Sequence, residues 1–184
     1  MQVTATTQSY TWVPSFDPTV HTTTLLNDKT LYSQALQTNS KTLQLGYTVT
    51  ATANSKETLG KYQKPDRELQ PLCRQAAYFT QSPNRWVLGH LLNGVIAGGE
   101  GIAENLFPIT KATNSHHLHQ VETYVKDAVT SASTAFPVTY TVQANPVAGK
   151  DKATPLDPYG SFLCTATDKH GNGLLGGSAT VNVT

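Results

Sequence analysis

A strict alternation of apolar and polar residues is the feature that most constrains how this chain can fold. In residues 42–51 the apolar positions are Leu43, Leu45, Tyr47, Val49 and Ala51. A period of two places successive side chains on opposite faces of a strand, so the pattern predicts a half-buried β-strand. Residues 138–144 repeat the pattern. Residues 162–167 and 179–183 predict two further strands, joined through the turn residues of 168–173.

One helix is clearly indicated, from about Lys111 to about Ala132. Its apolar positions are Leu118, Val121, Val125 and Ala128. They fall on one stripe of a helix, and Thr110 is placed to cap its first turn. The sequence therefore predicts an α+β fold, in which a β-rich sheet packs against one main helix. The Thr-rich residues 1–40 indicate strands and loops.

The size and charge of the chain restrict what it can be. A length of 184 residues predicts a single domain, 1–184, with a real hydrophobic core. With 14% charged and 38% hydrophobic residues, the chain lacks the composition of a disordered protein. A formal net charge of +1 argues against nucleic-acid binding by general electrostatics alone. A nucleic-acid enzyme of this charge would need a local positive site or a metal ion.

The ends and the cysteines give weaker indications. No apolar run approaches the roughly 20 residues that span a membrane, and the first residues lack the pattern of a signal peptide. We therefore expect no membrane partner, and a protein that is cytoplasmic or delivered into a target cell by a specialised secretion or injection machine. Cys73 and Cys164 are interpreted as two buried thiols, with a disulfide between them as the alternative.

Residues 85–122 concentrate polar groups that can bind metal or carry protons. Residues 85–92 are apolar on both sides of Gly89 and His90, which predicts a buried strand with His90 at or near its end. A loop with four glycines follows: Gly94, Gly98, Gly99 and Gly101. Asn105 comes next, Asn114 lies in the first turn of the predicted helix, and Glu122 lies further along it. Helix positions i and i+8 are about 80° apart, so Asn114 and Glu122 can lean over one side. Glu122 borders the apolar stripe and needs a partner there.

This segment resembles the DNA/RNA non-specific endonuclease family, which belongs to the ββα-metal or His-Me finger nucleases. The matching residues are Gly89, His90, Asn105 within Asn-Leu-Phe-Pro, Asn114 and Glu122. The segment further resembles nuclease domains found at the ends of bacterial polymorphic toxins and of contractile-injection effectors. The motif core spans about residues 85–130.

The resemblance implies a metal-dependent, non-specific endonuclease acting on DNA, RNA or both, with a ββα-metal centre. His90 would take a proton from water, as a neutral imidazole can near pH 7. Asn114 would be the direct ligand of Mg²⁺, with Mn²⁺ as a substitute, and Glu122 would hold water bound to the metal. Asn105 would brace the loop and the histidine. A toxin of this kind would also have a cognate inhibitor, or immunity, protein as partner.

The chain departs from the family where an Asp and an Arg precede Gly-His, because Val87 and Leu88 stand there. The arginine that stabilises the transition state is left open among Arg67, Arg74 and Arg85. This departure and the low net charge favour the alternative, a catalytically inactive β-rich binding module that retains the nuclease scaffold.

Three histidines on the predicted helix, His116, His117 and His119, raise the question of zinc. The chain has no His-Glu-x-x-His signature, and no Cys-x-x-Cys. These histidines are interpreted as surface residues of the helix. The alternative for His117 is an auxiliary metal ligand or a phosphate contact.

Overall fold

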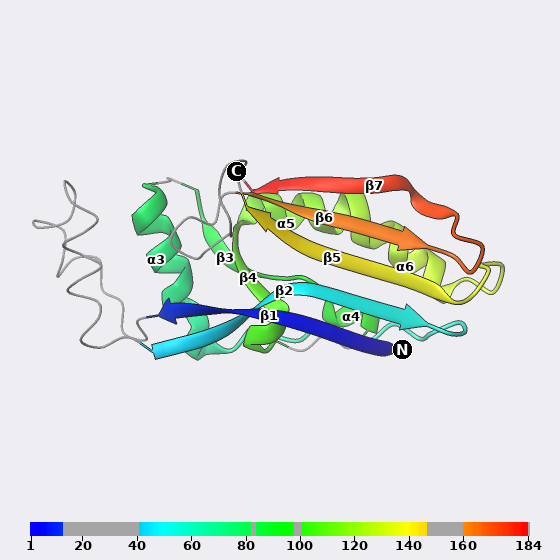
Figure 1. Cartoon of the computed structure of the whole chain (residues 1–184), viewed down its shortest axis with the longest axis horizontal. Helices are drawn as coiled ribbons and strands as arrows, with labels where there is room; N and C mark the ends of the chain where they lie inside the picture. The colour runs from blue at the N-terminus through cyan, green and yellow to red at the C-terminus, as the bar shows by residue number, and fades with distance from the viewer. Residues whose placement is uncertain (13–40, 82–83, 98–100, 147–159, 184) are drawn as a thin grey trace, which may run out of the picture.

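The computed structural model describes residues 1–12, 41–81, 84–97, 101–146 and 160–183. Within them the main feature is a five-stranded antiparallel sheet in the order β1-β2-β5-β6-β7 (Figure 1). Its strands are β1 (Gln2–Trp12), β2 (Lys41–Ala53), β5 (Val138–Pro146), β6 (Gly160–Thr167) and β7 (Gly173–Val183). A second, two-stranded sheet pairs β3 (Trp86–His90) with β4 (Leu106–Thr110).

The strand predictions for the large sheet are confirmed. In β5 the buried positions are Val138, Tyr140, Val142 and Ala144, and in β6 they are Phe162, Cys164 and Ala166. The alternate positions, largely Thr, face away from the core. Residues 2–12 of the Thr-rich start form β1, whereas residues 13–40 lie outside the described residues.

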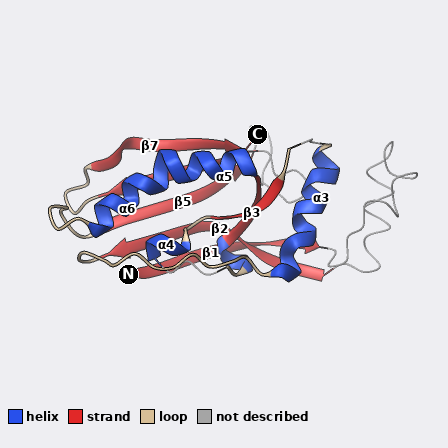
Figure 2. Ribbon diagram, turned by 180° about the vertical axis from the view of Figure 1, so that it is seen from behind, coloured by secondary structure: helices blue, strands red, loops and turns tan. Residues whose placement is uncertain are grey.

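The predicted helix is present and covers one face of the large sheet (Figure 2). It consists of α5 (Lys111–His117), a π-helical turn η3 (Leu118–Glu122) and α6 (Thr123–Thr130). The hydroxyl of Thr110 accepts a hydrogen bond from the Thr113 amide at 3.1 Å, which confirms the predicted cap. Val121 and Val125 are buried as predicted. Val129, rather than Ala128, completes the buried stripe.

The π-helical turn changes which side of the helix each residue faces. The backbone N–H of Thr123 donates to the carbonyl of Leu118, five residues earlier. Such a turn holds more residues than a regular one, so it reduces the roughly 80° that would separate Asn114 from Glu122 in a regular helix. The wide turn thus brings Glu122 closer to the direction of Asn114.

The prediction of only one main helix is wrong, because residues 70–80 form a second one, α3 (Gln70–Thr80), after the 3₁₀ turn η1 (Arg67–Leu69). Its signals were present in the sequence. Pro71 stands in its first turn. The buried residues Leu69, Leu72, Cys73 and Ala76 have helical spacing.

The segment between the two strands of the small sheet is also more ordered than a glycine-rich loop suggests. It contains α4 (Gly94–Ala97) and a 3₁₀ turn η2 (Ala103–Asn105), while Gly98 and Gly99 lie outside the described residues. The strand β4, which the sequence did not predict, is buried at all five positions. The fold is therefore α+β, and β4 leads directly into α5.

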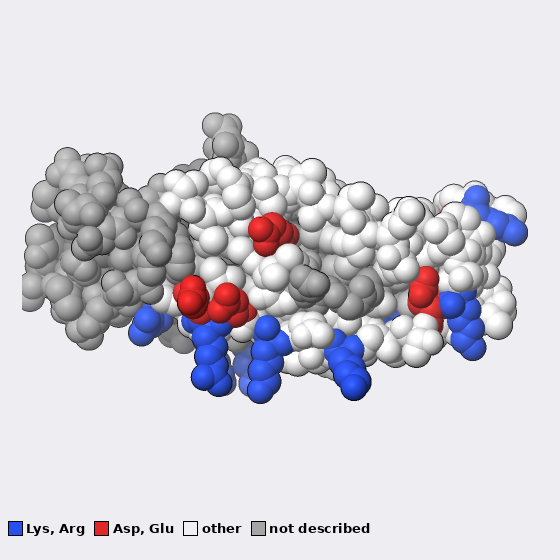
Figure 3. Space-filling view, turned by 90° about the horizontal axis from the view of Figure 1, so that it is seen from below, with Lys and Arg blue, Asp and Glu red and all other residues white. Residues whose placement is uncertain are grey.

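Buried side chains from both sheets and from the helices form one hydrophobic cluster. Cys73 and Cys164 are both buried and free, as the interpretation of two thiols predicted. The face seen in Figure 3 is mostly neither acidic nor basic, and most of its Lys and Arg side chains lie along one edge. Among the described helices, none combines the length and the apolar character that crossing a membrane requires.

Candidate functional site

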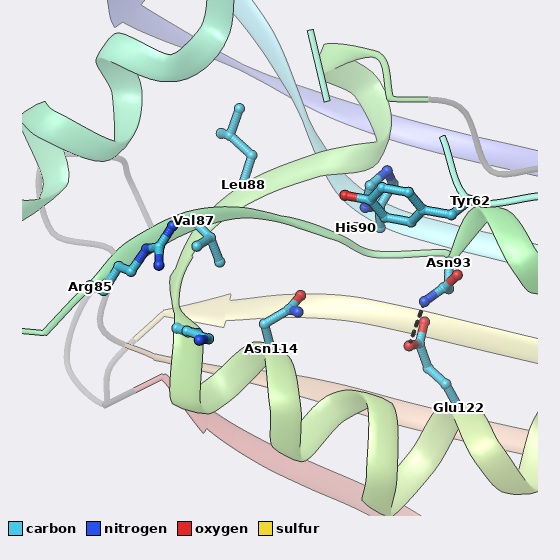
Figure 4. Close-up of a pocket in the computed structure, with 9 residues that line it drawn as sticks. Tyr62, Arg85, Val87, Leu88, His90, Asn93, Asn114 and Glu122 are labelled. Carbon is cyan, nitrogen blue, oxygen red and sulfur yellow. Dashed lines mark hydrogen bonds between the residues drawn. The ribbon is translucent and has the colours of Figure 1, made fainter. Parts of the chain in front are cut away.

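A pocket of about 310 Å³ lies between β3, the start of α5 and the segment that precedes α3 (Figure 4). Its lining residues are Tyr62, Arg85, Val87, Leu88, His90, Asn93, Lys111, Asn114 and Glu122. Three of the four predicted site residues, His90, Asn114 and Glu122, are therefore brought together. They come from a strand end, from the first turn of a helix and from the π-helical turn.

His90 is buried at the end of β3, with 7% of its surface exposed. Its Nε2 has no hydrogen-bond partner among the described residues. The backbone carbonyl of Gln63 accepts a hydrogen bond from the ring. Burial lowers the pKa of His90, and the Gln63 bond opposes this effect. Burial thus favours the neutral imidazole, whose Nε2 is without a partner among the described residues.

Tyr62 holds the other side of the imidazole. The two rings meet edge to face, with centroids 5.8 Å apart and planes at 65°. Tyr62 and Gln63 belong to the extended segment before α3. This segment is tied to the small sheet's connection by the Asp66 amide, which donates to the Gly101 carbonyl at 3.0 Å. The ring of His90 is therefore held by a segment remote from it in sequence.

Glu122 is buried beside the pocket, with 3% of its surface exposed. Its Oε2 accepts a hydrogen bond from Nδ2 of Asn93 at 3.1 Å, whereas Oε1 has no partner among the described residues. Burial raises the pKa of the carboxyl to about 7, against the opposing effects of Asn93 and of the Lys126 charge. A cation near Oε1 would offset the cost of keeping this carboxylate charged.

Asn93 is a site residue that the sequence reasoning missed. Its Oδ1 accepts a hydrogen bond from the Val95 amide at 2.9 Å, so the same side chain caps the start of α4 and holds Glu122. The signal was an Asn between an apolar run and Gly-Val-Ile-Ala, which is a typical helix start. The need of Glu122 for a partner, which was expected, is met here.

Asn114 is exposed on the first turn of α5 and rises toward β3, between Arg85 and the Asn93–Glu122 pair (Figure 4). A Cβ atom added at Gly89 would lie 3.4 Å from Oδ1 of Asn114 and only 2.1 Å from Cδ1 of Ile109. The glycine before His90 therefore allows β3, β4 and the helix to approach each other closely. This close approach places the Asn114 amide over the strand that carries His90.

Asn105 does not line the pocket but holds the chain just beyond His90. Its Oδ1 accepts a hydrogen bond from the Leu92 amide at 2.9 Å, and its Nδ2 donates to the Leu92 carbonyl at 2.8 Å. The backbone carbonyl of Asn105 accepts from the Leu91 amide at 2.9 Å. The Asn105 side chain therefore holds the chain after His90 away from the pocket, and its part in the site stays a prediction.

The three candidate arginines are separated by the fold. Arg85 lines the pocket together with Lys111, whereas Arg74 lines a neighbouring pocket and Arg67 lies in η1. The backbone carbonyl of Arg85 accepts a hydrogen bond from the Lys111 amide at 2.7 Å, which fixes both cations near the start of α5. Of the three, Arg85 shares a pocket with His90 and Asn114.

The interpretation of His117 as a surface residue is wrong. Its side chain is buried against the sheet, where Nε2 hydrogen-bonds with the hydroxyl of Tyr140 at 2.9 Å and the ring meets Phe162 at 5.4 Å. Burial, with the Lys126 charge, lowers its pKa to about 4. It is not among the residues that line the pocket. His116 and His119 are exposed, as predicted.

The donor set at the pocket fits a hard cation better than zinc. Across the described residues, no group of three His, Cys, Asp or Glu is placed to hold a metal ion. Mg²⁺ prefers oxygen ligands and keeps several waters, so one or two protein oxygens suffice. The amide oxygen of Asn114 and the unpartnered Oε1 of Glu122 are such oxygens, and both residues line the same pocket.

Comparison of the chain with protein-family models, with curated proteins and with solved structures finds no match. The likeness of residues 85–122 to nucleases therefore remains a prediction. What bears on function is the chemistry of the pocket itself, which the fold assembles from three separate elements.

Proposed function

We propose that this protein is a metal-dependent endonuclease that hydrolyses phosphodiester bonds of DNA or RNA. One observation carries the proposal. Two buried polar atoms without a partner among the described residues, Nε2 of His90 and Oε1 of Glu122, belong to side chains that line one pocket together with Asn114. Buried polar atoms are nearly always hydrogen-bonded, so two exceptions in one pocket indicate a place where a ligand completes the bonding.

The polar groups suit an attack of water on phosphorus. His90 takes a proton from water through Nε2, while the Gln63 carbonyl and the Tyr62 ring hold the imidazole in place. The hydroxide forms a bond to phosphorus as the bond to the leaving sugar oxygen breaks. That oxygen then takes a proton from solvent. Arg85 and Lys111 neutralise charge on the phosphate from the rim of the pocket.

Asn114 and Glu122 are the residues that would hold a cation. Asn114 would bind it through the amide oxygen, and Glu122 would hold water on it through Oε1. When bound, Mg²⁺ or Mn²⁺ would polarise the phosphate and stabilise negative charge on the leaving oxygen. The burial of Glu122 limits its charge without such a cation, because burial raises the pKa of its carboxyl to about 7.

The order of elements also supports the proposal. An antiparallel pair, β3 and β4, leads directly into a helix that carries Asn114 in its first turn. This is the succession that the resemblance to ββα-metal nucleases implies. Val87 and Leu88 line the pocket where that family has Asp and Arg, and Arg85 lines it too. We propose that Arg85 takes the phosphate contact of the missing arginine, and that the protein acts as a toxin or injected effector with an inhibitor partner.

Incubation of the protein with supercoiled plasmid and with RNA tests the proposal. We expect cleavage in Mg²⁺ or Mn²⁺ and none in excess EDTA. Full cleavage in excess EDTA, or activity in Zn²⁺ alone, would remove the proposed metal role. Nucleic acid that stays intact under all these conditions would favour the non-catalytic binding module instead.

A further inference from the structure

A second pocket, of about 530 Å³, adjoins the first between α3 and the start of β3. Its lining includes Gln70, Cys73, Arg74, Asn84, Arg85 and Trp86. Arg85 lines both pockets, so the second one continues from the rim of the first. The sequence left Arg74 open as an arginine of the site around His90, but it did not predict α3, the helix that carries Arg74.

The second pocket is positively charged. Arg74 and Arg85 are both exposed, and neither forms an ion pair within the described part of the chain. No acidic side chain is among its described lining residues. Burial raises the pKa of the Cys73 thiol to about 12, so this residue adds no negative charge at neutral pH. Two free guanidinium groups at one hollow attract an anion.

The two guanidinium groups stand on firmly held backbone. Arg74 lies on the outer face of α3, whose inner face buries Leu72 and Ala76. Arg85 precedes β3, and its carbonyl accepts from the Lys111 amide at 2.7 Å. Trp86, 7% exposed, also lines this pocket. A bound group would therefore meet two basic side chains carried by well-packed elements.

We propose that the second pocket binds a flanking phosphate of the same nucleic-acid strand whose scissile phosphate occupies the first pocket. The inference rests on the proposed function. Arginine binds phosphate oxygens through two parallel N–H donors, and the shared Arg85 joins the two positions along one path. Arg74 is then a strand-binding residue, distinct from the arginine that acts on the scissile phosphate.

The test compares a long substrate with one too short to reach the second pocket. Cleavage of a labelled oligonucleotide is measured over a range of NaCl concentrations, beside cleavage of bis(4-nitrophenyl) phosphate. Lys169→Ala serves as the matched control, because it also removes one exposed positive charge but lies in the β6–β7 turn, at the opposite end of the molecule from α3 (Figure 1).

For Arg74→Ala we expect kcat/KM on the oligonucleotide to fall roughly tenfold, the loss of one charge-assisted hydrogen bond. The slope of log kcat/KM against log salt should become shallower by about 1, as for one lost phosphate contact. Arg74→Glu should lower kcat/KM further. Cleavage of the small diester should match wild type in both variants, and Lys169→Ala should match it in every assay.

Three outcomes would overturn the inference. An Arg74→Ala protein with the wild-type rate and salt slope would show that the second pocket binds no strand, while the proposed function stands. An equal loss on the small diester would place Arg74 at the scissile phosphate. A wild-type protein that cleaves neither substrate would reject the proposed function and this inference together.

Discussion

Asn93 holds Glu122 through a hydrogen bond of 3.1 Å to Oε2, and leaves Oε1 buried without a partner among the described residues. This bond joins the turn that follows β3, where Asn93 lies, to the π-helical turn that ends at Glu122. Asn93 also caps α4 through its other side-chain atom. One side chain therefore fixes both the local loop and the direction of the carboxylate.

Replacing Asn93 by Ser should separate these two roles. Serine keeps an oxygen that can cap α4, but it is too short to reach Glu122. We expect cleavage to fall roughly 10–100-fold, as for other groups that orient metal-bound water, and the Mg²⁺ requirement to rise. The melting temperature should stay close to wild type. An Asn93→Ser protein with the wild-type rate and the wild-type Mg²⁺ requirement would show that Asn93 only caps α4.

Asn114 and Glu122 should differ in the damage that their loss causes. Asn114→Ala removes the proposed direct ligand, so cleavage should be abolished at ordinary Mg²⁺ and partly restored at high Mg²⁺. Glu122→Gln keeps the shape and one acceptor oxygen, so the loss should be milder, roughly 10–100-fold. The two variants are compared by their cleavage rates over a Mg²⁺ titration, at matched thermal stability. The reverse order would make Glu122 the direct ligand.

Gly89→Ala should destabilise the protein because the new methyl would collide with Ile109, whose Cδ1 lies 2.1 Å from the added Cβ. We expect a loss of about 1–3 kcal/mol in the free energy of unfolding. Combining it with Ile109→Ala, which removes the colliding atoms, should cost less than the sum of the two single changes. Urea unfolding measures all three variants, and strict additivity would mean that the close approach is absent.

His117 should make the protein sensitive to acid. Its pKa is lowered from 6.5 to about 4, because burial against Phe162 and Tyr140 disfavours the charged ring. A lowered folded-state pKa gives stability that is present above pH 6.5 and is lost as pH falls toward 4. The loss reaches roughly 3 kcal/mol.

His117→Gln offers a non-titrating acceptor to the Tyr140 hydroxyl. As pH falls from 6.5 to 4, the unfolding free energy of wild type should decrease relative to that of this variant. Glu122 acts in the opposite direction. Because its folded-state pKa is raised, it contributes stability that is present below pH 4.5 and is lost as pH rises through 7. Since both proteins contain Glu122, its effect cancels in the comparison. A difference that does not change with pH would contradict the assignment.

The large sheet was predictable because apolar and polar residues alternate one by one along its strands, as the apolar Val138, Tyr140 and Val142 do. The main helix was predictable from its stripe and its Thr110 cap. The second helix, α3, was missed although Leu69, Leu72 and Ala76 have helical spacing. The strand β4 was missed because Pro108 interrupts a short apolar run, which is weak evidence for a strand.

The site was predictable only in part, because its geometry depends on contacts between distant segments. His90, Asn114 and Glu122 line one pocket, but the π-helical turn that redirects Glu122 has no simple sequence signal. Tyr62 and Gln63 reach His90 from a segment that pattern reasoning cannot place. His117 was misjudged although it lies four residues before the buried Val121, because its hydrogen bond to the distant Tyr140 hydroxyl has no sequence signal.

The rate of oligonucleotide cleavage by His90→Ala tests the central claim most directly. His119→Ala is the matched control, since His119 is exposed on the same helix as Asn114 and does not line the pocket. With melting temperatures within a few degrees of wild type, His90→Ala should be slower by roughly 10²–10⁴-fold and His119→Ala unchanged. A folded His90→Ala protein that cleaves at the wild-type rate would show that His90 is not the base, and would contradict the account.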